Sequence, residues 1–227
     1  MLFRPDRYLG TDAQATQFAR QLGFGLLVSQ LDGELHFSHL PLIVDSEGDR
    51  IVCLRGHFSR MNPHWRALEK QPEATVVFNG PNAYISAQWY TPECQAAPSW
   101  NYATVHASGV VRILDTPEET TQIVNELIVI NESRLPRQWD LNSYSPTRRA
   151  TLTPHILGFA LDVSRMEEKF KLSQHHADAD RRGAIAGLRE RGDCDGRMMA
   201  DMMEAVAARP LDTAARLRGK APSVQQD

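Results

Sequence analysis

Residues 51–65 of the chain read IVCLRGHFSRMNPHW, and this stretch decides how the rest of the fold is interpreted. Its apolar start predicts a buried strand, which we expect to run into a polar loop and then into a helix. Asn62 is a favoured helix cap, and Pro63 is tolerated at a first helical position. The expected loop carries Gly56, His57, Ser59 and Arg60. A helix start with a hydroxyl and a guanidinium is chemistry that holds a phosphate, although an ordinary strand–turn–helix junction with Arg60 in water fits the same letters.

Turn signals divide the first half of the chain into short apolar runs. Asp32-Gly33 predicts a hairpin, and Asn79-Gly80 predicts another turn. Pro41 interrupts the second run and predicts a sheet edge or a bulge. The expected strands are 24–30, 35–44, 51–54, 74–78, 83–86 and 100–114. Six such runs spaced by turns favour an antiparallel barrel or sandwich.

Capping signals place helices around this sheet. Thr11 or Asp12 can cap a helix over 11–22, and a further helix is expected over 63–70. Thr116 to Glu119 form a capping box that opens a helix. The apolar stripe of that helix is Ile123, Leu127 and Ile130.

The second half of the chain adds one strand and more helices. A short helix is expected after Pro146, a strand over 156–163, and helices over 178–191 and 197–208. We expect one domain over residues 1–208, with C-terminal helices from about 165 to 208. Residues 209–227 have the composition of a disordered tail.

Composition excludes several classes of protein. The chain has 227 residues, 42% of them hydrophobic, and a formal net charge of -3, which gives no global argument for nucleic-acid binding. No apolar run approaches the ~20 residues that span a bilayer, and the first residues lack the apolar core of a signal peptide. Three widely spaced cysteines form neither a disulfide framework nor a CxxC pair. We therefore expect a cytoplasmic protein that is not inserted in a membrane.

Common catalytic and metal motifs are missing from the sequence. GxSxG, GxGxxG, Walker A, HExxH and CxxC do not occur. His36 and His39 lie three apart on an expected strand, so they point to opposite faces and cannot chelate one metal ion. We predict no metal site, and the catalytic residues, if there are any, are unknown.

Two further runs each leave two interpretations open. The run from Trp100 to His106 could line a flat ligand, or its large residues could fill a barrel core. In the run EEKFKLSQ, residues 167–174, the side chains of Lys169, Lys171 and Ser173 share one face if the segment is extended. Two ammonium groups aimed at an acidic ligand explain this pattern, and a solvated basic edge explains it nearly as well.

Taken in order, these motifs resemble the PaiB family, described as FMN-binding negative transcriptional regulators. The resemblance covers about residues 1–205. It rests on SHLPL (38–42), GH (56–57), NPHW (62–65), GPNAYIS (80–86), WY (89–90), PSWNY (98–102), VH (105–106) and KFKLSQ (169–174). The resemblance implies a six-stranded antiparallel split barrel of the FMN-binding type, and a homodimer with FMN at the subunit interface.

The resemblance also implies a cofactor site. Ser59, Arg60 and Asn62 would lie at the FMN phosphate, and His39, Leu40 and Pro41 would pass the isoalloxazine ring. Trp100, Asn101, Tyr102 and His106 would line its other side, Lys169, Lys171 and Gln174 would close the pocket, and Ser38 and His57 complete the set. The family usually continues with Asn-Arg where this chain has His175-His176. That departure could alter ligand affinity, and it introduces side chains that titrate near pH 6.5.

The function implied by the resemblance is FMN-dependent regulation. An acidic chain without a helix-turn-helix motif is an awkward direct repressor, because DNA binding needs a basic surface. Direct DNA binding is therefore doubtful, and a protein partner in regulation is possible. The alternatives are an FMN-dependent oxidoreductase that acts on a small molecule, and a flavin- or haem-binding protein without catalysis.

Overall fold

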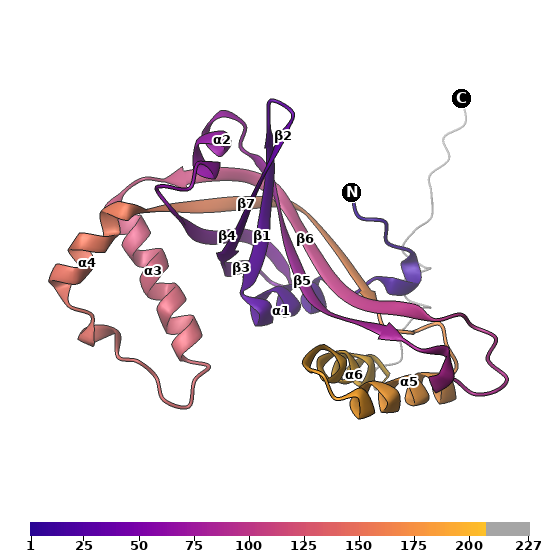
Figure 1. Ribbon diagram of the computed structural model, residues 1–227. Helices are drawn as coiled ribbons and strands as arrows, with labels where there is room; N and C mark the ends of the chain where they lie inside the picture. Colours follow the sequence, from indigo (N-terminus) through magenta and orange to yellow (C-terminus); the bar gives the residue numbers. More distant parts are fainter. Residues whose placement is uncertain (208–227) are drawn as a thin grey trace, which may run out of the picture. The chain divides into compact units, whose positions relative to one another are not determined.

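The computed structural model describes residues 1–207, apart from the side chain at position 149. The strands are β1 (Phe24–Leu31), β2 (Glu34–Pro41), β3 (Ile43–Glu47), β4 (Arg50–Ser59), β5 (Glu73–Ile85), β6 (Ser99–Leu114) and β7 (Ile156–Lys171). The α-helices are α1 (Asp12–Leu22), α2 (His64–Lys70), α3 (Pro117–Glu132), α4 (Pro146–Leu152), α5 (Asp178–Arg191) and α6 (Cys194–Ala207). Figure 1 shows this order from indigo to yellow. The tail predicted over 209–227 lies outside the described residues.

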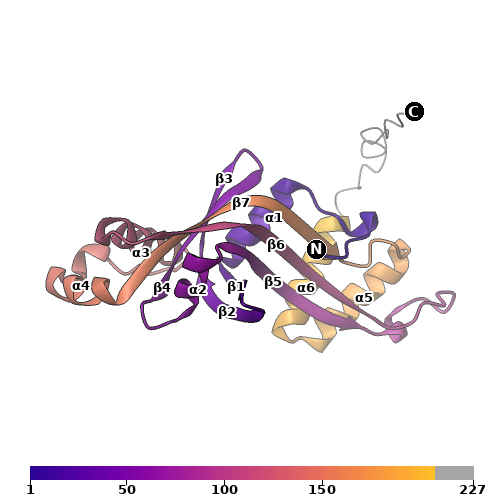
Figure 2. The ribbon, with the colours of Figure 1, turned by 90° about the horizontal axis from the view of Figure 1, so that it is seen from above.

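The strands form one sheet in the order β2-β1-β5-β6-β7-β4-β3. Figure 2 shows β5, β6 and β7 running side by side. The two edge strands, β2 and β3, are joined by the single residue Leu42, whose N–H donates to the Gly23 carbonyl. The sheet therefore curls until its edges meet, as the expected barrel requires.

The described residues form seven strands, so the prediction of a six-stranded barrel was wrong. The run over 35–44 divides into β2 and β3 just after Pro41, which confirms the predicted interruption. Two expected strands, 74–78 and 83–86, are a single strand, β5, and the last strand continues to Lys171 instead of ending near 163. The helix predicted to start at 197 begins at Cys194.

Asn79-Gly80 does not turn the chain, contrary to prediction. Gly80 has no positive φ and lies inside β5. A Cβ atom there would collide with the Phe18 ring of α1, so the glycine makes room for an aromatic side chain. A glycine in the sequence indicates a turn and a close approach of another side chain to the backbone equally well.

The expected polar loop before residue 60 is strand as well. Gly56, His57, Phe58 and Ser59 pair with residues 156–159 of β7, which satisfies their backbone groups. Gly56 lies against the Phe159 ring and the Pro41 carbonyl, where a side chain would not fit. The helix begins at His64, one residue later than predicted, although the Asn62 side-chain oxygen still accepts the His64 N–H.

Several local predictions are confirmed. The Thr11 hydroxyl caps α1 in a capping box with Gln14, and Asp32 and Gly33 both adopt positive φ in the β1–β2 hairpin. Thr116 caps α3, and its stripe residues Ile123 and Leu127 are buried, whereas Ile130 is 36% exposed. The predicted α5 has the bounds found in the structure. No helix within residues 1–207 is long and apolar enough to cross a membrane.

The chain divides into two compact units. Unit 1 is Met1–Gly80 with Ala103–Phe170, and unit 2 is Pro81–Tyr102 with the described residues from Lys171 on. In unit 1 the inward side chains of β4 include Leu54 and Phe58, and the Phe58 ring packs on Phe159 with centroids 4.8 Å apart. In unit 2 α5 places Gly187 against the Trp89 indole. Arg189 of α5 also pairs with Asp201 and Glu204 of α6.

Candidate functional site

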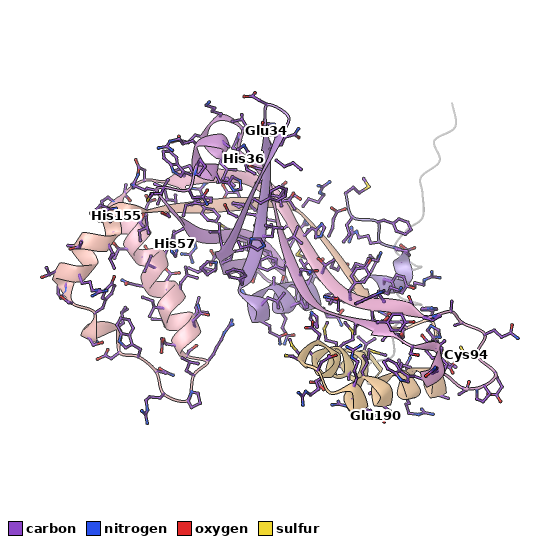
Figure 3. All side chains as sticks on the ribbon, viewed as in Figure 1. Glu34, His36, His57, Cys94, His155 and Glu190 are labelled. Atoms are coloured by element: carbon purple, nitrogen blue, oxygen red, sulfur yellow. The ribbon has the colours of Figure 1, made fainter. Side chains whose placement is uncertain are left out.

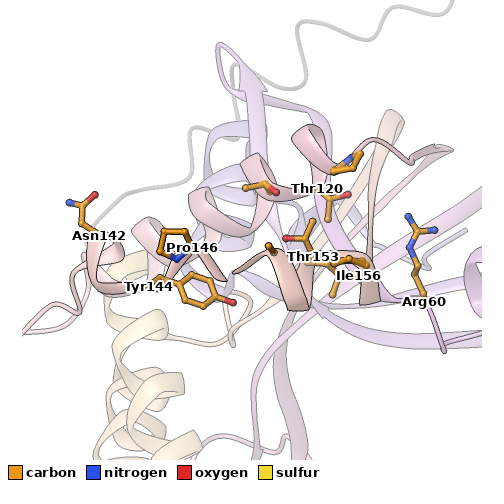
Figure 4. A pocket seen from close by; sticks show the side chains of 11 residues that line it. Arg60, Thr120, Asn142, Tyr144, Pro146, Thr153 and Ile156 are labelled. Carbon is orange, nitrogen blue, oxygen red and sulfur yellow. The ribbon is translucent and has the colours of Figure 1, made fainter. Parts of the chain in front are cut away.

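Arg60 stands at the rim of a cavity in unit 1. The cavity has a volume of about 750 Å³, within the range of small-molecule sites. Figure 4 shows its wall, which comes from α3, α4 and the turn before β7. The lining residues include Arg60, Thr120, Thr121, Tyr144, Thr153 and Ile156. Arg60 is the one member of the predicted cofactor set among them.

The backbone of Arg60 is fixed from two sides. Its N–H donates to the His155 carbonyl at 2.9 Å, and its own carbonyl accepts the Trp65 indole N–H at 3.0 Å. Its guanidinium is 39% exposed and pairs with Asp115, 72% exposed, at 2.6 Å. Exposed pairs of this kind contribute only about 0–1 kcal/mol, so an anionic ligand can displace the aspartate.

Two residues that closely follow Arg60 in the sequence, Asn62 and His64, belong to a buried network of polar side chains. The imidazole of His64, 2% exposed, is bonded through Nδ1 to the Ser38 hydroxyl at 2.8 Å and through Nε2 to the Ser29 hydroxyl at 2.9 Å. The Asn62 amide donates to the same Ser38 oxygen at 2.9 Å. The network therefore ties α2 to β1 and β2, and it uses both polar ends of the Asn62 side chain.

The His64 imidazole is neutral at pH 7. Burial, assisted by the neighbouring His36 ring, lowers the pKa of His64 to about 4. Ser38 and Asn62, both in the predicted cofactor set, are thus already bonded to protein groups. In this structure they position α2, while Ser59 and Arg60 of the same segment keep groups at the surface.

His57 points away from the barrel interior, on the same face of β4 as Arg55. That face is covered by α3, since Arg55 pairs with Asp45 and with Glu126 of the helix. The Nδ1 atom of His57 is buried without a hydrogen-bond partner among the described residues. Burial lowers the pKa of His57. An unpaired buried nitrogen is costly, so a ligand or a water molecule that supplied a bond here would be favourable.

The outward face of the β1–β2 hairpin is apolar. The register pairs Phe24 with Pro41 and Leu26 with His39, which places these side chains on one face. Phe24, Leu35 and Phe37 are 53–58% exposed, and His39 stacks on Phe24. Leu40 is buried on the opposite face. Of the residues predicted beside the ring, His39 and Pro41 therefore share an exposed apolar face, and Leu40 does not.

Lys169 of β7 binds the N-terminal segment. It is 7% exposed, and its ammonium donates to the Phe3 carbonyl at 2.9 Å and lies over the Phe3 ring. The preceding Glu168 pairs with Arg4. The lysine is therefore not part of the solvated basic edge that the sequence also allowed. His106 of β6 is half-buried, and burial lowers its pKa against the opposing effect of Glu167.

The remaining predicted residues belong to unit 2. Trp100 is 53% exposed and meets Tyr84 edge to face, so it fills no barrel core. Asn101 is buried, and its side-chain amide donates a hydrogen bond to the Ser173 hydroxyl. Ser173 lies beyond the end of β7 and has a φ of +61°. The segment is therefore not extended there, and Ser173 does not share a strand face with Lys171 as predicted. Three predicted residues remain. Tyr102 is half-buried, and the Lys171 ammonium is hydrogen-bonded to the Ser99 hydroxyl. The Gln174 side-chain oxygen accepts the Leu172 N–H.

Sequence reasoning missed two features of unit 1. One is the hydrogen bond between Ser29 and His64, two residues that come from separate elements. The other is the cavity wall from α3 and α4. The only sequence signal for the first was a set of small polar residues at inward strand positions, which a barrel core also tolerates.

The family described as "Putative FMN-binding domain" matches residues 2–165. The chain belongs to this family. It is also 31% identical over 205 residues to "Protease synthase and sporulation protein PAI 2" of Bacillus subtilis, with 89% of this chain and 97% of that protein covered. The family match includes every predicted cofactor residue except Lys169, Lys171 and Gln174.

Solved structures show the same fold. The FAD and heme binding protein of Mycobacterium smegmatis superimposes with a TM-score of 0.54 at 14% identity, covering 77% of this chain and 78% of that one. A conserved hypothetical protein of Mycobacterium tuberculosis gives a TM-score of 0.54 at 12% identity, covering 78% and 96%. The split-barrel fold expected from the resemblance is thereby confirmed, with seven strands.

Proposed function

We propose that the protein binds FMN in unit 1, as a homodimer, and acts as a flavin-dependent regulator. The observation that carries the proposal is Arg60, a guanidinium fixed at the rim of a ligand-sized cavity in a chain of the FMN-binding family. Among the described residues, its side chain pairs with the exposed Asp115. A phosphate dianion is a stronger partner for a guanidinium than a solvated carboxylate is.

The residues present fit a phosphate-bearing flavin. Ser59 and Arg60 supply a hydroxyl and a guanidinium at the surface, and His57 supplies a buried nitrogen that lacks a partner. His39 and Pro41, on the apolar hairpin face, offer flat contact for a ring system. Bound FMN would supply oxidation–reduction chemistry, while the residues of this chain would bind and orient it.

The exposed hairpin face supports a homodimer. Phe24, Leu35 and Phe37 lie along one face of the hairpin, and each is more than half exposed in a single copy. A second copy on the same face would bury these side chains by two-fold symmetry. His39 and Pro41 on that face would then lie at the subunit boundary, where the family resemblance puts the flavin.

Regulation is favoured over catalysis by the name of the Bacillus subtilis relative, which refers to protease synthesis and sporulation. The net charge of -3 argues that the protein acts through a partner or a flavin signal more than through DNA. A mobility-shift assay across salt should show weak binding without sequence preference. Steady NAD(P)H oxidation by the FMN-loaded protein would instead identify the oxidoreductase.

The test of the FMN site is a titration of Arg60→Ala with FMN and with riboflavin, which lacks the phosphate. Loss of a charge-assisted bond of roughly 1.5–3 kcal/mol should weaken FMN binding about 10- to 150-fold and leave riboflavin nearly unchanged. Arg112→Ala removes an arginine from another ion pair of unit 1, with Asp162, and is the matched control. Asp115→Asn should strengthen FMN binding, because it removes the carboxylate that competes for Arg60. Equal losses for FMN and riboflavin in Arg60→Ala would refute the phosphate role.

A further inference from the structure

Unit 2 contains a cluster of three side chains with metal-binding atoms. Cys94, His176 and Asp180 each offer one ligand atom, and these atoms all lie within 4.8 Å of one another. Figure 3 shows Cys94 in the loop beside α5. None of the three belongs to the predicted cofactor set. Their distance along the chain explains why no motif revealed them.

Turns and a helix start hold the three residues in place. Cys94 follows a turn in which its N–H donates to the Thr91 carbonyl, and His176 closes a similar turn onto Ser173. Asp180 lies in the first turn of α5 and accepts both the N–H and the hydroxyl of Thr91 at 2.8 Å. The carboxylate is thus already oriented by partners that a bound metal ion would not remove.

Tyr90 provides an independent sign that a ligand belongs here. Its ring stacks on His176 with centroids 4.7 Å apart. Its hydroxyl is buried, in a residue only 8% exposed, and has no hydrogen-bond partner among the described residues. This ring contact places Tyr90 beside the cluster. A buried O–H donor without an acceptor is unfavourable, and a metal-bound water would supply that acceptor.

We propose that Cys94, His176 and Asp180 bind Zn²⁺, with the Tyr90 hydroxyl hydrogen-bonded to a water molecule in the fourth coordination position. Sulfur and imidazole ligands select Zn²⁺ over Mg²⁺ and Ca²⁺, which prefer oxygen. Three protein ligands leave one position of a tetrahedral ion open, as in zinc sites that react with small molecules. The site is carried by unit 2 and stands independently of FMN binding.

The test uses the full chain, freed of metal with a chelator and titrated with Zn²⁺ and with Co²⁺. We expect one ion per chain, a thiolate–cobalt charge-transfer band, and tetrahedral cobalt absorption. Cys94→Ser should abolish the charge-transfer band and weaken Zn²⁺ at least about 100-fold, since losing even an outer partner costs about 10- to 100-fold. His176→Arg, which restores the arginine of the resembled family, should do the same without touching the Thr91 bonds.

Controls separate this site from others. Cys194→Ser removes an exposed thiol from the same unit and should leave both metals bound with unchanged affinity. Tyr90→Phe should keep the charge-transfer band but lower Zn²⁺ affinity about 10- to 100-fold. Circular dichroism of each variant checks folding. Failure of the folded wild-type chain to bind Zn²⁺, or a cobalt spectrum that survives Cys94→Ser, would overturn the proposal.

Discussion

The buried His64 should make unit 1 sensitive to mild acid. The pKa of His64 is lowered from the ordinary 6.5 to about 4 when the chain folds. Between these pH values the unfolded chain binds a proton that the folded chain does not. The free energy of unfolding therefore has its full value above pH 6.5 and falls as the pH drops toward 4.

The size of the effect follows from the shift. Each pKa unit is worth about 1.4 kcal/mol, so about 3 kcal/mol is lost by pH 4 and about 2 kcal/mol between pH 7 and pH 5. Replacing His64 by Gln removes the titration while keeping an amide that can bond Ser38. The gap in free energy of unfolding between wild type and His64→Gln should shrink by about 2 kcal/mol from pH 7 to pH 5.

Urea unfolding at several pH values measures the gap, and proton NMR of the His64 ring gives its pKa directly. Other histidines with lowered pKa values, such as His57 and His106, are present in both proteins and cancel in the difference. His155→Gln, the same substitution at an exposed histidine, is the matched control for the exchange of an imidazole for an amide. A His64 ring that titrates near pH 6.5 in the folded protein would refute the reasoning.

Three further outcomes are expected. Thr116→Ala removes the cap of α3 and should lower the free energy of unfolding by about 1 kcal/mol in urea titration, and an unchanged midpoint would contradict the capping role. Gly80→Ala should cost about 1–3 kcal/mol through the Phe18 ring, with partial recovery when Phe18→Leu is added; no recovery would exclude that contact as the cause. Light scattering should give twice the monomer mass of 25.5 kDa. Phe37→Glu should yield monomers, whereas the control Val129→Glu, at an exposed position of α3, should not. A wild-type monomer at micromolar concentration would refute the dimer.

Features that depend only on neighbouring residues could be predicted from the sequence. Thr11, Thr116 and the Asp32-Gly33 turn act within a few residues of themselves, so their roles could be predicted without a fold. The ordered set of motifs, from SHLPL at 38–42 to KFKLSQ at 169–174, indicated the family, because order along the chain is a property of sequence.

Tertiary structure decided everything that rests on contacts between distant segments. The letters Asn79-Gly80 form a strand because Phe18 occupies the space beside the glycine, and His57 is in a strand because β7 pairs with it. Lys169 binds the carbonyl of Phe3, which is 166 residues away along the chain. In each case local preference amounts to a fraction of a kcal/mol per residue, and packing and hydrogen bonding across the fold outweigh it.

The candidate sites divide in the same way. Arg60 was predicted as a phosphate ligand from its local setting, as a guanidinium beside a helix start. The His64 network and the group of Cys94, His176 and Asp180 were not, since their members come from separate elements. Spacing along the chain cannot show such groups, because the folded backbone alone sets the distances between them.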